Sequence, residues 1–265
     1  MPFEELKQKH SVVWGTGPYE RVSATLADMH DDLVDRLEPG PDDRWLDAAT
    51  GTGEVAKRAA RRGADVVGLD LAPGLIDTAR QEAGDEGLDI EFDVGDAEAM
   101  PYDDASFDVI SSAVGIMFAP DHAAIARELG RVCRPGGRVC LACWRPDSAL
   151  ADMFRLMAPF QPAPPPPGAG SPFDWGREEH VTELLDGDFE LEFVGLDSLL
   201  VGPSGEWVWE LFSTSYGPTK VLADGLEPER RAELAEAFAA LHEEYRDGDE
   251  IRMPRTYLLT LGTRR

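Results

Sequence analysis

The chain has 265 residues, and 43% of them are hydrophobic, which is enough for one large domain with a buried core. Its formal net charge of −26 argues against DNA or RNA as a partner, because phosphate binding needs a basic face. No run of about 18 apolar residues occurs, so no membrane insertion is expected. The N-terminal sequence lacks the apolar stretch of a secretory signal, so a cytoplasmic location is expected.

The first two thirds of the chain predict a regular alternation of strands and helices. Residues 1–39 are expected to form a helical cap segment, with one amphipathic helix over 19–37. The predicted strands then lie at 44–48, 64–70, 88–94, 107–113 and 138–144, and helices at 54–63, 72–84 and 121–133 separate them. This pattern is typical of an α/β fold, a mostly parallel sheet with helices on both faces.

The regular alternation ends after Trp144. A Pro-rich insertion near 158–172 is expected to be a loop or spacer, because proline lacks an N–H donor and has a fixed φ. Beyond it, helices are predicted at 177–187, 204–215 and 228–247, and strands at 189–201 and 254–263. The sequence therefore predicts a main domain over 40–265, with a helical insertion near 203–250.

Cys133, Cys140 and Cys143 lie close together in the sequence. The last two have the C-x-x-C spacing of redox and metal sites, but the stretch "GRVCLACW" also has the composition of a buried strand. Residues three apart in a strand point to opposite faces, so Cys140 and Cys143 could not share a metal or form a disulfide. We therefore expect buried free cysteines and no metal site.

The stretch "LDAATGTGEVA" at 46–56 places a glycine loop between a predicted strand and the next helix. Gly51-x-Gly53-x-x-Ala56 is a form of the dinucleotide fingerprint, and Asp70 lies where such proteins bind a ribose. An NAD(P)-dependent oxidoreductase is therefore one interpretation. No Gly-x4-Gly-Lys-Ser/Thr motif occurs, so a nucleoside triphosphate is not expected.

Three acidic residues, Asp47, Asp70 and Asp96, lie at the carboxyl ends of three neighbouring predicted strands. The carboxyl ends of parallel strands line one crevice, where open α/β sheets bind ligands. Pyrophosphate would be repelled there, whereas S-adenosylmethionine (SAM) carries an ammonium and a sulfonium. In this interpretation Asp70 accepts from the ribose hydroxyls, and Asp96 and the N–H of Ala97 meet the adenine edge.

Four blocks in order, "LDAATGTGEVA", "VVGLDLAPGLIDTAR", "GDAEAMPYDDASFDVI" and "ELGRVCRPGGRVCL", resemble a class I SAM-dependent methyltransferase over about residues 40–145. The branch looks most similar to the ubiquinone/menaquinone-biosynthesis C-methyltransferases and related small-molecule enzymes. The resemblance implies a Rossmann-like sheet of seven strands whose last strand is antiparallel. It also implies SAM as cofactor and S-adenosyl-L-homocysteine (SAH) as product.

The resemblance also implies roles for individual residues. Those around the methionyl part would be Asp47, Ala49, Gly51 and Thr52, while Leu71 would pack on adenine and the backbone of Ala113 would meet the amino end. Two positions depart from the common pattern. Ala49 replaces the first loop glycine, and Ala113 lacks the hydroxyl that is often found there.

Residues near the acceptor are predicted less directly. The N-terminal stretch "HSVVWGTGPYERV" could close over the cofactor, with Tyr19 among the cofactor-binding residues and Trp14 beside the substrate. Phe118 and His122 follow the fourth strand and are the other substrate candidates. No catalytic residue is assigned, because displacement at a sulfonium needs a base only when the acceptor must lose a proton.

The stretch after the fourth strand, "SSAVGIMF", lacks the Asn-Pro-Pro-Tyr/Phe motif of enzymes that methylate nitrogens in nucleic acids and some proteins. With the acidic composition, this favours methyl transfer to O, N or C of a small molecule. A non-catalytic SAM-binding module stays open beside the oxidoreductase interpretation. The oligomeric state is not predicted, and a homodimer stays open.

Overall fold

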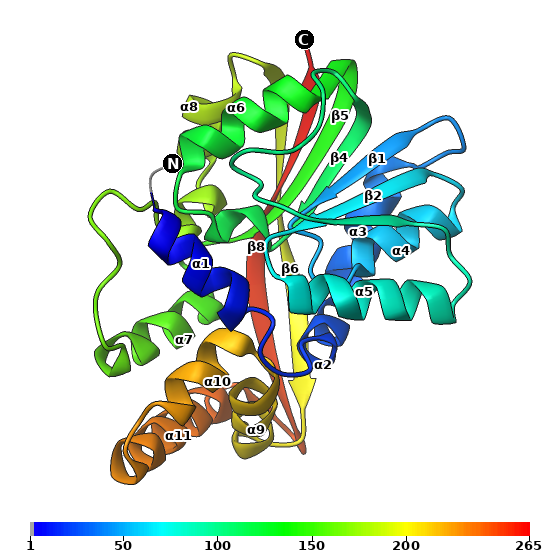
Figure 1. Ribbon diagram of the computed structural model, residues 1–265. Helices are drawn as coiled ribbons and strands as arrows, with labels where there is room; N and C mark the ends of the chain where they lie inside the picture. Colours follow the sequence, from blue (N-terminus) through cyan, green and yellow to red (C-terminus); the bar gives the residue numbers. More distant parts are fainter. Residues whose placement is uncertain (1–2) are drawn as a thin grey trace.

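The computed structural model describes residues 3–265, so residues 1–2 of the predicted N-terminal segment lie outside the described residues. Its centre is one sheet with the strand order β3-β2-β1-β4-β5-β8-β6 (Figure 1). The strands are β1 (Arg44–Ala48), β2 (Asp65–Asp70), β3 (Glu91–Val94), β4 (Phe107–Ala113), β5 (Cys133–Trp144), β6 (Phe189–Gly202), β7 (Arg246–Asp247) and β8 (Glu250–Arg264).

The pairing of the strands confirms the predicted mostly parallel sheet. The five strands from β1 to β5 pair in parallel, whereas β8 is antiparallel to both of its neighbours, β5 and β6. The sheet has eight strands rather than seven, because the two-residue strand β7 forms a tight hairpin with the start of β8. The last long strand is antiparallel, as predicted.

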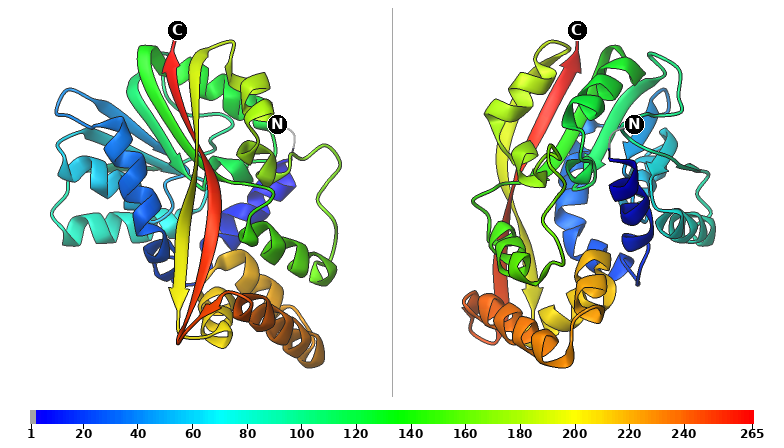
Figure 2. Two further views of the ribbon diagram at one scale, coloured as in Figure 1. Left: turned by 180° about the vertical axis from the view of Figure 1, so that it is seen from behind. Right: turned by 60° about the vertical axis from the view of Figure 1, so that its left-hand side comes forward.

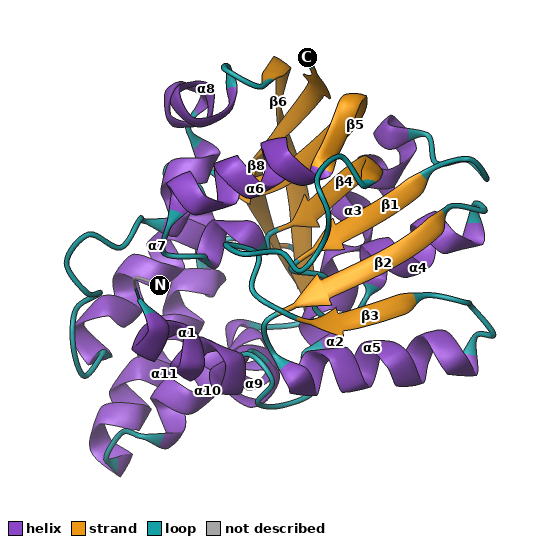
Figure 3. Ribbon diagram, turned by 45° about the horizontal axis from the view of Figure 1, so that its top comes forward, coloured by secondary structure: helices purple, strands orange, loops and turns teal. Residues whose placement is uncertain are grey.

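Helices cover both faces of the sheet (Figure 3). They are α1 (Glu4–Val13), α2 (Glu20–Ser23), α3 (Ala27–Leu37), α4 (Glu54–Arg61), α5 (Pro73–Asp85), α6 (His122–Val132), α7 (Ala149–Met157), α8 (Glu178–Leu185), α9 (Gly205–Ser215), α10 (Gly217–Asp224) and α11 (Pro228–Glu243). The helix predicted over 19–37 is broken by a 3-10 turn, Ala24–Leu26. This break lies at Thr25, whose carbonyl oxygen accepts a hydrogen bond from Arg255.

A long antiparallel ribbon extends from the sheet toward the helices of residues 205–243. Strands β6 and β8 stay paired from Phe189↔Arg264 to Gly202↔Ile251, and Figure 2 shows this ribbon running the length of the molecule. Helices α9, α10 and α11 pack together at its far end (Figure 1). Helix α1 contacts both α5 and α10, so it connects the helices beside the sheet to this helical group.

The core contains the three cysteines. Cys133, Cys140 and Cys143 are all buried and free, as predicted, and burial raises the pKa of the Cys133 thiol to about 11. Within residues 3–265 no group of three or more His, Cys, Asp or Glu side chains is placed to hold a metal ion. The described helices include none whose length and apolar character would let it cross a membrane.

Candidate functional site

A cavity opens where β1, β2 and β4 end. Eleven of the thirteen predicted site residues line it: Trp14, Tyr19, Asp47, Ala49, Gly51, Asp70, Leu71, Asp96, Ala97, Ala113 and Phe118. The fold therefore brings together residues separated by more than 100 positions in the chain, and their individual roles stay predictions. The other two, Thr52 and His122, do not line the cavity.

Asp47, the penultimate residue of β1, is a buried carboxylate, only 2% exposed. Its oxygens accept hydrogen bonds from the hydroxyls of Thr50 at 2.6 Å and Ser111 at 2.7 Å, and Trp45 in turn donates to Ser111. Burial raises the pKa of Asp47 to about 6 in spite of these donors. Among the described residues it forms no salt bridge, so a cation entering the cavity would meet an uncompensated buried carboxylate.

Asp70 ends β2 and fixes the shape of the glycine loop. One carboxylate oxygen accepts from the N–H of Gly51 at 2.8 Å, and the other accepts from the N–H of Ala72 at 2.9 Å. Burial raises the pKa of this carboxyl as well. Gly51 has φ +59°, and a Cβ there would lie 3.7 Å from the Tyr19 ring, so glycine keeps this part of the cavity open.

Ala49 occupies the position at which the resemblance leads one to expect glycine, and its φ of +55° is in the left-handed region. Its methyl group and carbonyl also pack so tightly on Gly115 that a Cβ at Gly115 would approach both within 2.6 Å. Ala49 therefore has a strained backbone conformation, and it packs against Gly115.

We expect Ala49→Gly to stabilise the protein by about 0.5 to 1 kcal/mol, because glycine adopts a positive φ without strain. Urea unfolding measures the change. The control is Ala48→Gly, at a buried β1 position where φ is not positive, which should destabilise. Equal destabilisation by both substitutions would show that the positive φ of Ala49 carries no strain.

Asp96 is held by Lys7, a residue that the sequence analysis did not single out. The Lys7 ammonium, on α1, donates to Asp96 at 2.6 Å and to Glu98 at 3.0 Å, and all but 5% of the Lys7 side chain is buried. Burial acts to lower the pKa of Lys7, but the hydrogen bonds and charges of the two carboxylates outweigh it and raise this pKa. The other oxygen of Glu98 accepts from the N–H of Asp121 at 2.7 Å. Helix α1 is thereby attached to the loop after β3.

Glu54 is a second lining residue that the sequence analysis missed. It is the first residue of α4, where the backbone of a dinucleotide-binding protein meets the pyrophosphate. Its carboxylate accepts from Lys57 at 2.7 Å and from Arg58 at 2.6 Å. These two cations compensate the charge of Glu54 and hold its side chain at the start of the helix.

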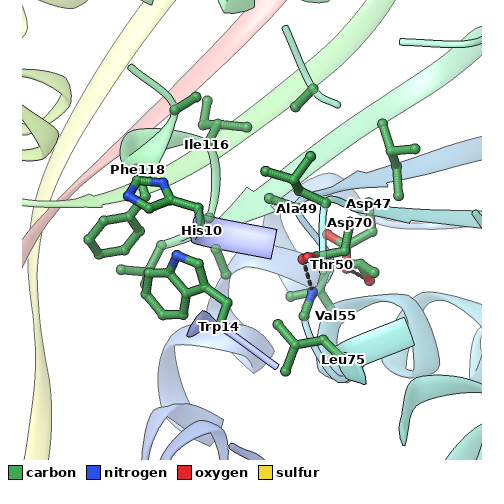
Figure 4. Close-up of a pocket in the computed structure, with 18 of the residues that line it drawn as sticks. His10, Trp14, Asp47, Ala49, Thr50, Val55, Asp70, Leu75, Ile116 and Phe118 are labelled. Atoms are coloured by element: carbon green, nitrogen blue, oxygen red, sulfur yellow. Dashed lines mark hydrogen bonds between the residues drawn. The ribbon is translucent and has the colours of Figure 1, made fainter. Parts of the chain in front are cut away.

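The far side of the cavity is aromatic. Figure 4 shows Asp47 and Asp70 on one side and His10, Trp14 and Phe118 on the other. The ring centroids of Trp14 and Phe118 are 4.8 Å apart. His10 also comes from α1, and burial together with nearby Lys9 lowers its pKa, so this imidazole is neutral at pH 7 and can accept a proton.

The two predicted residues outside the lining are both buried. The Thr52 side chain is 1% exposed, and its hydroxyl has no hydrogen-bond partner among the described residues. His122 turns to His180, with Nδ1 and Nε2 of the two rings 2.9 Å apart, and packs against Trp175. Burial lowers the pKa of His122 to about 4. This placement gives no support to the predicted contact of His122 with substrate.

Comparisons with known proteins place this geometry in a family. A family model described as a methyltransferase domain matches residues 46–141. An uncharacterized protein of Mycobacterium tuberculosis is 37% identical over 225 residues, which cover 82% of this chain and 80% of that protein. The demethylmenaquinone methyltransferase of Deinococcus radiodurans is 41% identical over 117 residues, 43% of this chain and 48% of that enzyme.

Solved structures show the same fold. The geranyl diphosphate C-methyltransferase of Streptomyces coelicolor A3(2), crystallised with Mg²⁺, geranyl-S-thiolodiphosphate and SAH, superposes with a TM-score of 0.55. The match covers 90% of this chain and 76% of that one, with 24% sequence identity. Its identity is low, so the likeness extends to the architecture alone.

Proposed function

The chain belongs to the class I SAM-dependent methyltransferases, and from this premise we propose that it methylates O, N or C of a small molecule. One observation carries the proposal most strongly. The cavity places the buried carboxylates of Asp47 and Asp70 beside the glycine loop, and neither forms a salt bridge within residues 3–265. A cofactor with a cationic amino acid end and a ribose fits these acceptor groups.

The chemistry of the carboxylates assigns them to different parts of SAM. Asp47, desolvated and without a cation, would hold the ammonium, and Asp70 has lone pairs left for the ribose hydroxyls after binding Gly51 and Ala72. Asp96 already accepts from Lys7 and from the N–H of Glu98, so its predicted contact with adenine would use its remaining acceptor capacity. Bound SAM supplies a methyl group activated by the sulfonium.

The protein's own part in the reaction is alignment and exclusion of water. Trp14 and Phe118 close the aromatic side of the cavity, and the contact of Lys7 with Asp96 holds α1 in place over it. If the acceptor atom carries a proton, neutral His10 is placed to take it.

Asp70→Ala is expected to weaken SAH binding by about 1 to 3 kcal/mol, since hydrogen-bond partners in a buried site are left unpaired. Titration calorimetry measures the affinity. Asp65→Ala is the matched control, at the opposite, exposed end of the same strand. If Asp70→Ala binds SAH as tightly as this control, Asp70 has no part in the site.

A methyl-transfer assay distinguishes an enzyme from a non-catalytic SAM-binding module. Purified protein is incubated with methyl-labelled SAM and a fractionated metabolite extract. We expect label in at least one small-molecule fraction, and loss of this label with Asp70→Ala. Binding of SAH without label in any fraction would favour the module. The oxidoreductase alternative is opposed by Asp47, a buried carboxylate without a salt bridge among the described residues, beside the loop where a pyrophosphate would lie.

A further inference from the structure

A second, smaller cavity adjoins the cofactor cavity. The two share four lining residues, Tyr19, Leu26, Val114 and Phe118. Half of the remaining lining residues are aromatic, namely Trp144, Phe154, Phe212 and Tyr216. Arg255 is the one charged residue that lines it within the described chain.

The position of Arg255 breaks the pattern of its strand. On β8 the buried side chains of Ile251, Met253 and Tyr257 alternate with more exposed ones, and Arg255 occupies the same buried series. The residue is 1% exposed, yet an apolar side chain is what this periodicity predicts. Residues that depart from the burial pattern of their strand are expected at functional sites, so Arg255 is a candidate functional residue.

The partners of Arg255 are all neutral. Its guanidinium donates to the carbonyl and hydroxyl oxygens of Thr25 and to those of Ser198. These four contacts use four of the five N–H donors of arginine and leave one at Nη1. The nearby carboxylate of Asp28 accepts instead from Ser198 and from the N–H of Leu199.

The charge of Arg255 is therefore compensated only in part. Within residues 3–265 the guanidinium forms no salt bridge, and its one aromatic contact is with Trp144, 5.8 Å from the ring centroid. Burial lowers the pKa of Arg255 to about 10, which still leaves the group charged at pH 7. A buried cation without an anion is unfavourable, and a bound anion would relieve this.

We propose that the second cavity is the acceptor site and that it takes an aromatic molecule bearing an anionic oxygen, which Arg255 binds. This inference rests on the proposed methyltransferase function. The acceptor atom would meet the methyl group at the wall that the two cavities share. There a lone pair of the acceptor forms the new bond to carbon, and the electron pair of the sulfur–methyl bond stays on sulfur. A proton on the acceptor atom leaves to His10 or to water.

The charge of the site decides between an anionic and a cationic acceptor. Aromatic walls alone can bind a cation, because ring faces carry negative potential. Here no carboxylate lines the second cavity, and Arg255 would repel a cation. The hydroxyl of Tyr19 stays protonated, since burial raises its pKa to about 12, so it is a neutral donor at the shared wall.

The test compares 3-hydroxy-2-naphthoate with 3-hydroxy-2-naphthamide, which differ in the anionic group. Calorimetry on SAH-saturated protein should show the naphthoate binding at least about tenfold more tightly than the amide. The reason is that a charge-assisted hydrogen bond to Arg255 is stronger than a neutral one. Arg255→Gln should remove this preference and leave SAH affinity within about twofold. The control is Arg252→Gln, an exposed arginine of the same strand, 3.4 Å from Glu250, which should keep the preference.

Three outcomes would overturn the inference: no binding of the naphthoate, equal binding of acid and amide, or a preference that survives in Arg255→Gln. If Arg255→Gln does not fold, Met153→Trp fills the second cavity from a residue that does not line the cofactor cavity. That variant should lose the naphthoate and keep SAH, and unchanged naphthoate binding would count against the site. Failure of the wild type to bind SAH would refute the proposed function itself.

Discussion

Asp47→Asn is expected to stabilise the ligand-free protein at pH 7 and, at the same time, to weaken SAH binding about 10- to 100-fold. The wild-type carboxyl has a pKa of about 6 when folded, against 3.8 in the unfolded chain, so the folded state disfavours the ionised form. Converted at 1.36 kcal/mol per unit, this difference corresponds to about 2 to 3 kcal/mol of stability lost by the wild type at pH 7. The loss of affinity follows from removing a charged partner of the ammonium.

The pH dependence identifies the cause. Well below pH 3.8 the carboxyl is protonated in both states, so its ionisation contributes nothing to the difference. As pH rises from about 4 through 6, the unfolded state releases its proton first, so wild-type stability falls relative to the variant. Urea unfolding at several pH values should therefore show a gap between Asp47→Asn and wild type that grows over this range and is constant above it.

The exposed residue Asp42 gives the control, because Asp42→Asn removes one carboxylate from the same region without touching a buried one. The stability of Asp42→Asn should not depart from that of wild type as pH rises, and its SAH affinity should be unchanged. An Asp47→Asn protein that is less stable than wild type at pH 7 would mean that the buried carboxylate is stabilising, contrary to this account.

Lys7→Met is expected to have the largest effect on stability, a loss of about 3 to 5 kcal/mol. The substitution leaves the carboxylates of Asp96 and Glu98 without their cation, and Glu98 is 1% exposed at its side chain. Helix α1 then loses its attachment to the loop after β3, so amide exchange over Glu4–Val13 should accelerate. Urea unfolding and hydrogen exchange measure the two effects.

Lys9→Met is a close control, since Lys9 lies on the same helix but is exposed. It should leave both measurements near their wild-type values. Equal exchange rates for α1 in Lys7→Met and wild type would show that other contacts, such as those with α5 and α10, hold the helix.

Much of the fold could be predicted because its signals are local and periodic. Five buried strands with short glycine-containing turns predict a parallel sheet, and β1, β2 and β4 lie within one residue of their predicted bounds. Two kinds of element were missed or misjudged. Helix α1 is mostly polar and its buried residue is Lys7, so no apolar stripe marks it. The break near Thr25 contacts Arg255, 230 residues away in the chain, so no local pattern marks it.

The acidic half of the site was also predictable, because each carboxylate lies at or just after the carboxyl end of a strand. The prediction that these carboxylates lie together required only the rule that parallel strands end at one edge of the sheet; they are Asp47, Asp70 and Asp96. The basic and neutral partners, Lys7, His10 and Arg255, come from the two ends of the chain and reach the cavities through tertiary packing. One signal for Lys7 was available, since lysine occurs at only four positions in this chain.

His122 shows the limit of reasoning from position alone. It follows β4, close in sequence to the lining residues Ala119 and Pro120, yet its ring turns toward Trp175 and His180. A helix begins at His122, so neighbouring side chains diverge by about 100° along it, and one residue decides which side is reached. Sequence proximity to the site therefore could not predict contact with it.

The central claim is that the carboxylate-lined cavity binds the cationic, adenosine-bearing cofactor SAM rather than a dinucleotide. Titration calorimetry of SAH and of NAD against the same wild-type protein tests it most directly. We predict that SAH binds one to one, with an affinity that falls in Asp47→Asn and in Asp70→Ala, and that NAD gives no binding. Saturable binding of NAD together with no binding of SAH would contradict the claim.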